Sequence, residues 1–386
     1  MIRGSRTAGA LTFALLLTAT AAACSSKPGP SASTIKIALE APLSGTQASN
    51  GIDQFNGAKL AVDQANAAGG VLGKKLELVR ADDKADAATG LTVAAQMVAD
   101  KVFAVVGPYN SSVGVKNIKT YLNAGVVVIH LTSNSSTNGE GYTIQPKDYQ
   151  IAPVEAKAIE GFYKAKSVAI VYDPSTYTSG IAGQVKTALE HAGVTVVTYA
   201  KIDPNAKSYA GLLSGIQKKK PDLLYVSTYY PEGGTIAKNL QAMRARPTCL
   251  MGLANQDAGF VQAAGLAAAR LCDFSGVPSA ENFPLATTYV SNYKTAYGTD
   301  PGTWGTFTFD SVNLLIAAVK RAGAWDAAKV RTALRDTKDF KGITGTMSID
   351  PATGNRVDVP VVILTLSTDG KYTVNQKWAA FAHFGG

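Results

Sequence analysis

Histidine and cysteine are scarce in this chain, with three of each among 386 residues. Zinc and iron–sulfur sites use these residues in clusters at short spacing, so we expect neither a metal site nor a cofactor of that kind. The sequence also lacks Gly-x-Ser-x-Gly, His-Glu-x-x-His and Gly-x-x-x-x-Gly-Lys-Ser/Thr, the signatures of common hydrolases and nucleotide enzymes. These absences argue against an enzyme.

A concentrated positive charge is also missing, although the chain is basic. Its 37 Lys and Arg residues against 28 Asp and Glu give a formal net charge of +9, and the longest basic run is 218–220. Nucleic-acid-binding proteins usually gather such charge into a stripe, so we expect no nucleic-acid partner. The length suits about two domains, and hydrophobic residues at 46% suit a globular fold.

Long apolar runs are confined to the N-terminus. Arg3 and Arg6 precede an apolar or small stretch over 8–23. This pattern is typical of a secretory signal and is short for a membrane span of ~20 apolar residues; a permanent anchor helix is the alternative. We expect 1–23 to be a signal peptide. The segment 24–34, rich in Ser, Pro and Gly, should be a flexible tether.

The three cysteines fall into two groups. Cys24 ends the run Ala21-Ala22-Ala23-Cys24, which is similar to the bacterial lipoprotein box, although that box usually has Leu where Ala21 stands. The resemblance implies lipidation of Cys24, and so a lipid anchor at the extracytoplasmic face of the cell membrane. Cys249 and Cys272 lie at the edges of apparent strands. An even number in an exported chain favours a disulfide between them, and two buried thiols are the alternative.

From residue 35 onward, strand and helix patterns alternate. The strands are expected at 35–39, 75–80, 102–107, 126–129, 168–172, 194–199 and 223–227, and the helices at 53–68, 87–100, 111–124, 179–192 and 208–219. Repeated βαβ units predict an α/β fold with two doubly wound parallel sheets. In such sheets ligands bind beyond the C-terminal ends of the strands, where this chain has loops rich in Ser, Thr, Asn, Tyr and Gly.

Two of these loops suggest a site for a polar small molecule. Ser111 opens a helix directly after a buried strand, so it either caps that helix or helps to bind an anion at the helix N-terminus. Thr132 and Asn134 follow the neighbouring strand and could face the same point. Tyr177 and Tyr229, from the second half, could enclose an apolar or planar group, or could be ordinary surface tyrosines.

Several of these loops resemble the Leu/Ile/Val-binding protein family, the type I substrate-binding proteins of ABC importers. The most specific stretches are APLSG at 41–45, LELVRADD at 76–83, VVGPYNSS at 105–112 and VYDPSTYTSG at 171–180. The resemblance implies two α/β lobes joined by three crossover hinges. It places lobe 1 at 35–148 and 276–343, and lobe 2 at 149–275 and 344–386.

The same resemblance assigns roles within an interlobe site. Ser111, Thr132 and Asn134 match positions that hold the α-carboxylate of an amino acid. Four aromatic residues match positions that line the pocket: Tyr109, Tyr177, Tyr229 and Trp304. Asn50 stands where the branched-chain binders have an aromatic residue. Ala254 replaces the family's ammonium-binding Glu, a role that Asp257 could take if its loop turns inward; otherwise the ligand is a carboxylate, amide or other solute without an ammonium.

The sequence thus predicts an exported, monomeric receptor that delivers a small solute to the membrane permease of an ABC importer. A ligand sensor of the same fold, signalling to a membrane partner, is the alternative, and no sequence feature separates the two. In either case ligand binding would shift the population toward the closed form of the two lobes.

Overall fold

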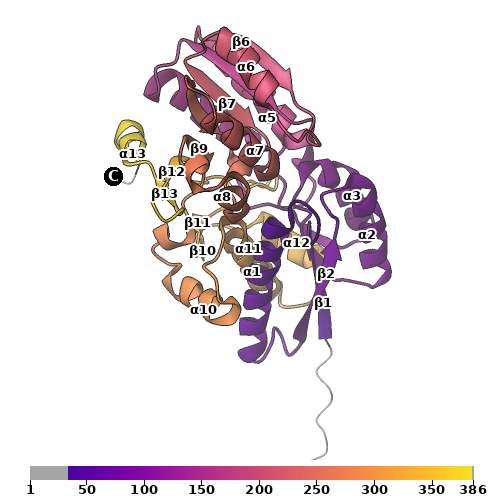
Figure 1. Cartoon of the computed structure of the whole chain (residues 1–386). Helices are drawn as coiled ribbons and strands as arrows, with labels where there is room; N and C mark the ends of the chain where they lie inside the picture. The colour runs from indigo at the N-terminus through magenta and orange to yellow at the C-terminus, as the bar shows by residue number, and fades with distance from the viewer. Residues whose placement is uncertain (1–33, 385–386) are drawn as a thin grey trace, which may run out of the picture.

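The computed structural model describes residues 34–384, which form two α/β lobes. The first lobe is built on a four-stranded parallel sheet in the order β2-β1-β3-β4 (Figure 1). Its strands are β1 (Thr34–Ala41), β2 (Lys75–Asp82), β3 (Ala104–Val106) and β4 (Val127–Ile129). β3, inside the sheet, and β4, at its edge, are both wholly buried, as expected for parallel strands covered by helices.

The second lobe contains a seven-stranded sheet in the order β13-β12-β9-β8-β7-β5-β6. Its strands are β5 (Ser167–Tyr172), β6 (Thr195–Lys201), β7 (Leu223–Ser227), β8 (Thr248–Met251), β9 (Cys272–Gly276), β12 (Val362–Leu366) and β13 (Tyr372–Val374). Strands β5 to β9 run parallel to one another. β12 pairs with β9 in the antiparallel sense, and β13 pairs antiparallel with β12 to form the edge of the sheet. This edge was not predicted from the sequence.

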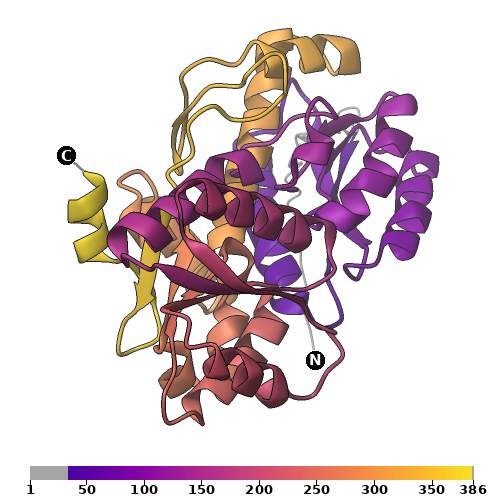
Figure 2. The ribbon, with the colours of Figure 1, turned by 90° about the horizontal axis from the view of Figure 1, so that it is seen from above.

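Helices cover both faces of each sheet. Those following the first-lobe strands are α1 (Ala48–Ala67), α2 (Ala87–Ala99) and α3 (Ser111–Asn123). Those of the second lobe are α4 (Asp148–Lys157), α5 (Thr176–His191), α6 (Ala210–Lys218), α7 (Tyr230–Gln241), α8 (Ala258–Ala264), α9 (Leu266–Ala269) and α13 (Gln376–Ala382). Figure 2 shows the second sheet between the layer of α4 and α5 and the layer of α6 to α8. No helix in residues 34–384 is both long enough and apolar enough to cross a bilayer.

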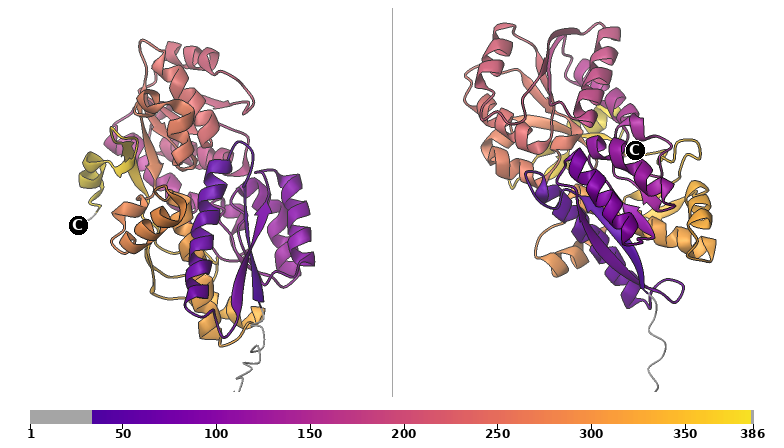
Figure 3. Two further views of the ribbon diagram at one scale, coloured as in Figure 1. Left: turned by 60° about the horizontal axis from the view of Figure 1, so that its bottom comes forward. Right: turned by 90° about the vertical axis from the view of Figure 1, so that its right-hand side faces the viewer.

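The chain crosses between the lobes three times, as the family resemblance implied. After β4 it enters the second lobe at α4, and after β9 it returns as α10 (Thr287–Tyr297), α11 (Thr303–Ala322) and α12 (Ala327–Arg335). It then crosses back to β12. The returning helix α11 lies along α1, so segments far apart in sequence complete one lobe (Figure 3).

The third crossing is built around a buried carboxylate on α11. Asp310 accepts hydrogen bonds from the N–H groups of Ile343 and Thr344 at 2.9 and 2.8 Å. β10 (Phe340–Gly342) and β11 (Gly345–Met347) form a hairpin here, and Thr143 pairs with Asn355 in a parallel bridge. The segment 344–356, which we expected to open the second lobe, is therefore bonded to first-lobe groups.

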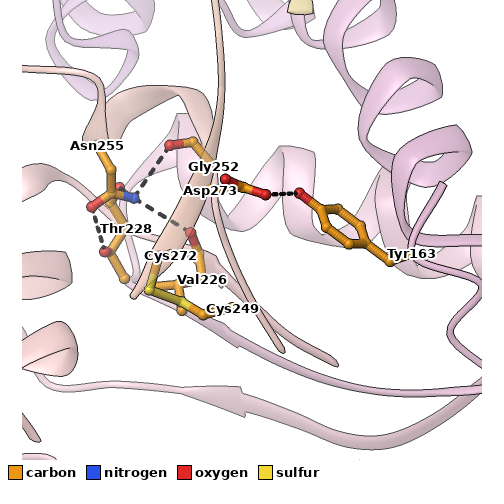
Figure 4. The surroundings of a disulfide bond; sticks show 8 residues. All are labelled: Tyr163, Val226, Thr228, Cys249, Gly252, Asn255, Cys272 and Asp273. Atoms are coloured by element: carbon orange, nitrogen blue, oxygen red, sulfur yellow. Dashed lines mark hydrogen bonds between the residues drawn. A yellow bond between two sulfur atoms is a disulfide. The ribbon is translucent and has the colours of Figure 1, made fainter. Parts of the chain in front are cut away.

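The two cysteines of the second lobe form a disulfide. Cys249 on β8 is the register partner of Cys272 on β9, and the two Sγ atoms are 2.12 Å apart (Figure 4). Both residues are buried. Cys24, the signal segment and the predicted tether up to residue 33 lie outside the described residues, and the last tether residue, Thr34, begins β1.

One helix begins earlier than its sequence indicates. We expected a helix from residue 53, because SGTQASNG reads as a loop, but α1 begins at Ala48. Gly51 lies in its first turn, where a Cβ atom would be 2.1 Å from the carbonyl oxygen of Pro42. The glycine therefore serves close packing and does not mark a turn. The shift places Asn50 inside the helix.

Candidate ligand-binding site

Ser111 occupies the first turn of α3, at the C-terminal edge of the first sheet. Its side chain is buried, and its Oγ accepts a hydrogen bond from the Asn134 N–H at 3.2 Å. The residue before it, Asn110, is the N-cap, so Ser111 does not cap its own helix. Within residues 34–384 the N–H groups of Ser111 and Ser112 have no acceptor. Together with the helix dipole they form a place suited to a carboxylate.

The loop after β4 meets this helix start. Thr132 Oγ1 is 2.9 Å from His130 Nδ1 and 2.7 Å from Thr137 Oγ1, so its hydroxyl is bonded within the loop. Asn134 turns its amide toward the other lobe, donating from Nδ2 to the carbonyl of Thr176 at 3.2 Å. The structure thus brings Thr132 and Asn134 to Ser111, with their side chains already engaged.

Aromatic side chains from both lobes converge beside Ser111. The ring of Tyr109 lies 6.0 Å from Trp304 of α11 and 6.4 Å from Tyr229 of the second lobe, between centroids. Burial raises the pKa of Tyr177 well above its ordinary value, with nearby Tyr109 and Tyr229 adding to the increase. The Tyr177 hydroxyl and Trp304 Nε1 are buried and lack a hydrogen-bond partner in the described chain. Tyr109, Tyr229 and Trp304 therefore form one ring cluster, and Tyr177 lies near enough for its pKa to respond to it.

A half-buried carboxylate on α1 sets the position of Trp304. Asp53 accepts the N–H groups of Gly302 at 2.8 Å and Gly305 at 2.6 Å, and the hydroxyl of Tyr293 at 3.0 Å. These bonds fasten the first turn of α11 to α1. Burial raises the pKa of Asp53, and the three donors oppose that increase.

Asp257 lies on the second-lobe side of Tyr109. It is the N-cap of α8, where its Oδ1 accepts the Gly259 N–H at 2.6 Å, and it also accepts the Ser49 hydroxyl across the lobes at 3.1 Å. Burial raises the pKa of Asp257 to about 6; the Gly259 N–H opposes this and the charge of Asp53 adds to it. Burial raises the pKa of Tyr109 well above its ordinary value, and the nearby charge of Asp257 adds to the increase.

The surroundings of Asp257 and Asn50 complete the site. Asp257, Ser49 and Asp53 line a cavity of about 260 Å³ at the junction of the lobes. Asn50 is buried and accepts a hydrogen bond from Gln54. Ala254 is buried in a 3₁₀ turn and offers no charge.

The lobes also touch directly. Ser112 Oγ accepts the Thr176 N–H at 2.9 Å and donates to Thr176 Oγ1 at 3.2 Å. On the other side of the aromatic cluster, the Tyr230 hydroxyl donates to the carbonyl of Thr46 at 2.7 Å. The described structure is thus a closed one, with the candidate site between the lobes.

A family model described as "Periplasmic binding protein" matches residues 34–371. The chain belongs to this family. A periplasmic binding protein of this kind is an extracytoplasmic solute-binding protein and not an enzyme, as the missing catalytic motifs predicted.

Three comparisons place this periplasmic binding protein among its relatives. It is 32% identical to the Leu/Ile/Val-binding protein BraC3 of Rhizobium johnstonii, over 81% of this chain and 86% of the relative. It is 30% identical to a leucine-, isoleucine-, valine-, threonine- and alanine-binding protein of Pseudomonas aeruginosa, over 83% and 86%. The crystal structure of the branched-chain amino acid transporter substrate-binding protein LivJ of Streptococcus pneumoniae with isoleucine matches at a TM-score of 0.81 and 29% identity, over 88% and 98%.

Sequence reasoning missed the groups that join the lobes in this binding protein. Ser112 was passed over in favour of Ser111, although both open the same helix. Thr176 and Ser49 lie in the first turns of α5 and α1, in polar stretches that the sequence reads as loops; the composition of these stretches indicated a site but did not single out these two residues. Only the packing of one lobe on the other gives these side chains partners.

Proposed function

We propose that this chain is the solute receptor of an ABC importer and binds a branched-chain or similar small amino acid between its lobes. The observation that carries the proposal is the pair of open N–H groups at Ser111, next to the ring cluster of Tyr109, Tyr229 and Trp304. The Asp257 carboxylate is close enough for its charge to act on Tyr109. The names of the relatives, which describe binders of leucine, isoleucine and valine, support the same class.

The site offers one set of groups to the carboxylate of an amino acid and another to its ammonium. The first turn of α3 offers two N–H groups and a hydroxyl to a carboxylate. Asp257 offers a negative charge to an ammonium, and the hydroxyl of Ser49 steadies it. The aromatic rings between the two ends suit an aliphatic side chain.

The absence of a glutamate at Ala254 favours a second candidate. Asp257 already accepts the Gly259 N–H, so it has less capacity left for an ammonium than an unengaged carboxylate would have. An ammonium left unpaired in a closed site would cost several kcal/mol of desolvation. The second candidate ligand is therefore a carboxylate without an ammonium, held at Ser111 in the same way.

A thermal melt of the purified protein separates these candidates. Leucine and 4-methyl-2-oxopentanoate share the side chain and the carboxylate and differ at the ammonium. A ligand at about 100 times its Kd raises the free energy of unfolding by ~2.7 kcal/mol, which is measurable as an increase of a few degrees in Tm. We expect leucine to raise the Tm and the keto acid to raise it much less. The reverse order would select the second candidate, and no shift with any small carboxylate or amino acid would overturn both.

Replacing Asp257 tests the ammonium contact directly. Asp257→Asn should weaken leucine binding tenfold or more and leave the keto acid's affinity nearly unchanged, since only leucine carries the charge that Asp257 pairs. Asp273→Asn, a carboxylate bonded to Tyr163 in the same lobe, is the control for general effects on the second lobe (Figure 4). With a pKa of about 6, Asp257 loses its charge below that pH, so leucine binding to the wild type should weaken below pH 6.

The membrane partner and the anchor are further parts of the proposal. We propose delivery to an ABC permease; a genomic neighbour encoding a sensor kinase in place of a permease would favour the sensor alternative. We also propose that Cys24 is lipidated after removal of 1–23 and that the receptor acts as a monomer. Cys24→Ala should release the protein from the membrane fraction, and mass spectrometry of the mature N-terminus should find the acyl chains.

A further inference from the structure

A lysine ammonium is buried beneath the Ser111 end of the site. Lys147 precedes α4, at the first crossing between the lobes, and its side chain is fully buried. Its Nζ donates to the carbonyl of Asn134 at 2.7 Å, the Thr137 hydroxyl at 2.9 Å and the carbonyl of Thr132 at 3.3 Å. All three donor positions of the ammonium are thus used to hold the loop that follows β4.

This ammonium has no carboxylate partner. It forms no ion pair with the residues that the structure describes. Asp148 on α4 is nearby but accepts from the N–H and hydroxyl of Ser135, and Glu140 pairs with Lys119 at 3.1 Å. His130, at the end of β4, is kept neutral, because burial and the Lys147 charge lower its pKa. A buried charge without a partner is costly, so its retention calls for a reason.

The loop that Lys147 holds leads directly to the carboxylate end of the site. The peptide units of Thr132 and Asn134 accept from Nζ on one side, and the N–H of Asn134 donates to Ser111 Oγ on the other. We propose that Lys147 is a positioning residue whose buried charge faces the carboxylate of the bound solute through the 132–134 loop, so that the ligand supplies its missing counter-charge. This inference rests on the proposed function, since it needs an anionic group at Ser111.

The geometry predicts that binding is linked to a proton. Burial lowers the pKa of Lys147 to about 7, although the charges of Asp148 and Glu140 oppose the decrease. We therefore expect part of the free protein to hold a neutral amine at this position above pH 7. A carboxylate arriving at Ser111 favours the ammonium, so Nζ takes a proton from the buffer as the ligand binds. Affinity should then fall by up to about tenfold for each pH unit above 7.

Calorimetry of leucine binding at pH 8, in two buffers of different ionisation enthalpy, measures this proton directly. We expect the wild type to take up close to one proton per leucine at pH 8 and much less at pH 6, where Lys147 is already charged. Lys147→Met should abolish the uptake at pH 8. Glu155 and Glu232, whose pKa values burial raises to about 7, are present in both proteins and cancel in the difference.

A pair of ligands and a pair of variants separate charge from structure. At pH 6.5, Lys147→Met should lose tenfold or more in affinity for leucine and little for leucinamide, which keeps the ammonium but lacks the carboxylate. Lys147→Arg keeps the charge at all these pH values, so it should bind leucine without proton uptake. Lys218→Met, on the exposed side of α6, is the control and should match the wild type.

Each outcome bears on one claim. If leucine binds with the same proton count at pH 8 in the wild type, Lys147→Met and Lys147→Arg, Lys147 does not face the carboxylate and the inference is wrong, while the proposed function stands. Where Lys147→Met does not fold, a wild type without proton uptake at pH 8 overturns the inference by itself. If neither leucine nor any other carboxylate binds the wild type, the proposed function itself fails.

Discussion

At the scale of single residues, the candidate site depends on which polar atoms are left open. Ser111 offers a helix start whose first N–H groups have no acceptor in the described chain, and Asp257 offers a carboxylate whose pKa lies close to physiological pH. The hydroxyl of Tyr177 and the indole N–H of Trp304 are similarly unengaged. Buried polar groups are rarely left without partners, so these atoms support the proposed position of the solute.

Ser111→Ala tests the carboxylate end. Removing the hydroxyl takes away one hydrogen bond to a charged group, which is worth roughly 1.5–3 kcal/mol, so leucine affinity should fall about 10- to 100-fold. The free energy of unfolding should fall by about 1 kcal/mol, because the variant also removes the acceptor of the Asn134 N–H. Isothermal calorimetry measures the affinity, and Ser214→Ala on the exposed side of α6 is the control. Equal leucine affinity in the two variants would show that the ligand carboxylate does not bind at Ser111.

The sequence identified some of these residues and could not identify others. Ser111 and Tyr109 follow a wholly apolar strand, so their place at its C-terminal end was predictable from the topology of parallel sheets. Lys147 was not found, because lysine is almost always exposed and the run QPKD has nothing to indicate burial. Lys147 is buried because the loop after β4 folds over it, and this packing is not encoded in the local sequence.

At the scale of elements, the contact between α1 and α11 positions the aromatic side of the site. The two helices approach so closely that a Cβ atom on Gly57 would lie 2.0 Å from the carbonyl oxygen of Gly305. Asp53, one turn earlier, bonds the start of α11. Trp304 lies between Gly302 and Gly305, the two residues at the start of α11 that make these contacts, so the contacts fix its position.

Gly57→Ala should therefore destabilise the protein although alanine is the better helix former. The added methyl group meets backbone, which cannot rotate away, so we expect a loss of about 1–3 kcal/mol and a Tm lower by several degrees. Gly215→Ala on α6 is the matched control: nothing lies within 4 Å of its Cβ position, and it should gain up to about 1 kcal/mol. Equal melting temperatures for the two variants would contradict the close contact.

Long apolar strands and helices with clear periodicity were predictable, but the elements that close the fold were not. β12 and β13 are short and join the second sheet only at its antiparallel edge. The segment 344–356 has no repeating pattern, and its place is decided by Asp310 and by the bridge from Thr143 to Asn355. Such long-range pairings leave little trace in local sequence.

At the scale of the whole molecule, function depends on the balance between open and closed lobes. Ser112 bonds to Thr176 across the junction, as Tyr230 does to Thr46. These bonds exist only when the lobes meet, so they favour the closed state whether or not they touch a ligand. A solute that contacts both lobes further increases the population of the closed state.

Ser112→Ala should weaken this closure. It removes both hydrogen bonds to Thr176 and leaves the Ser111 hydroxyl in place, so leucine affinity should fall several-fold through a smaller closed population. Small-angle scattering should show a larger radius of gyration for the unliganded variant than for the wild type. Unchanged scattering and affinity would mean that the Ser112–Thr176 contact follows closure without stabilising it.

The three crossings also bear on the order in which this chain is made. Synthesis runs from the N-terminus, so β1 to β4 and α1 are complete long before α11 exists to cover the apolar side of α1. The whole parallel part of the second sheet is produced in between. The first lobe, which the chain begins first, is therefore the lobe whose core is completed last, when α11 packs on α1.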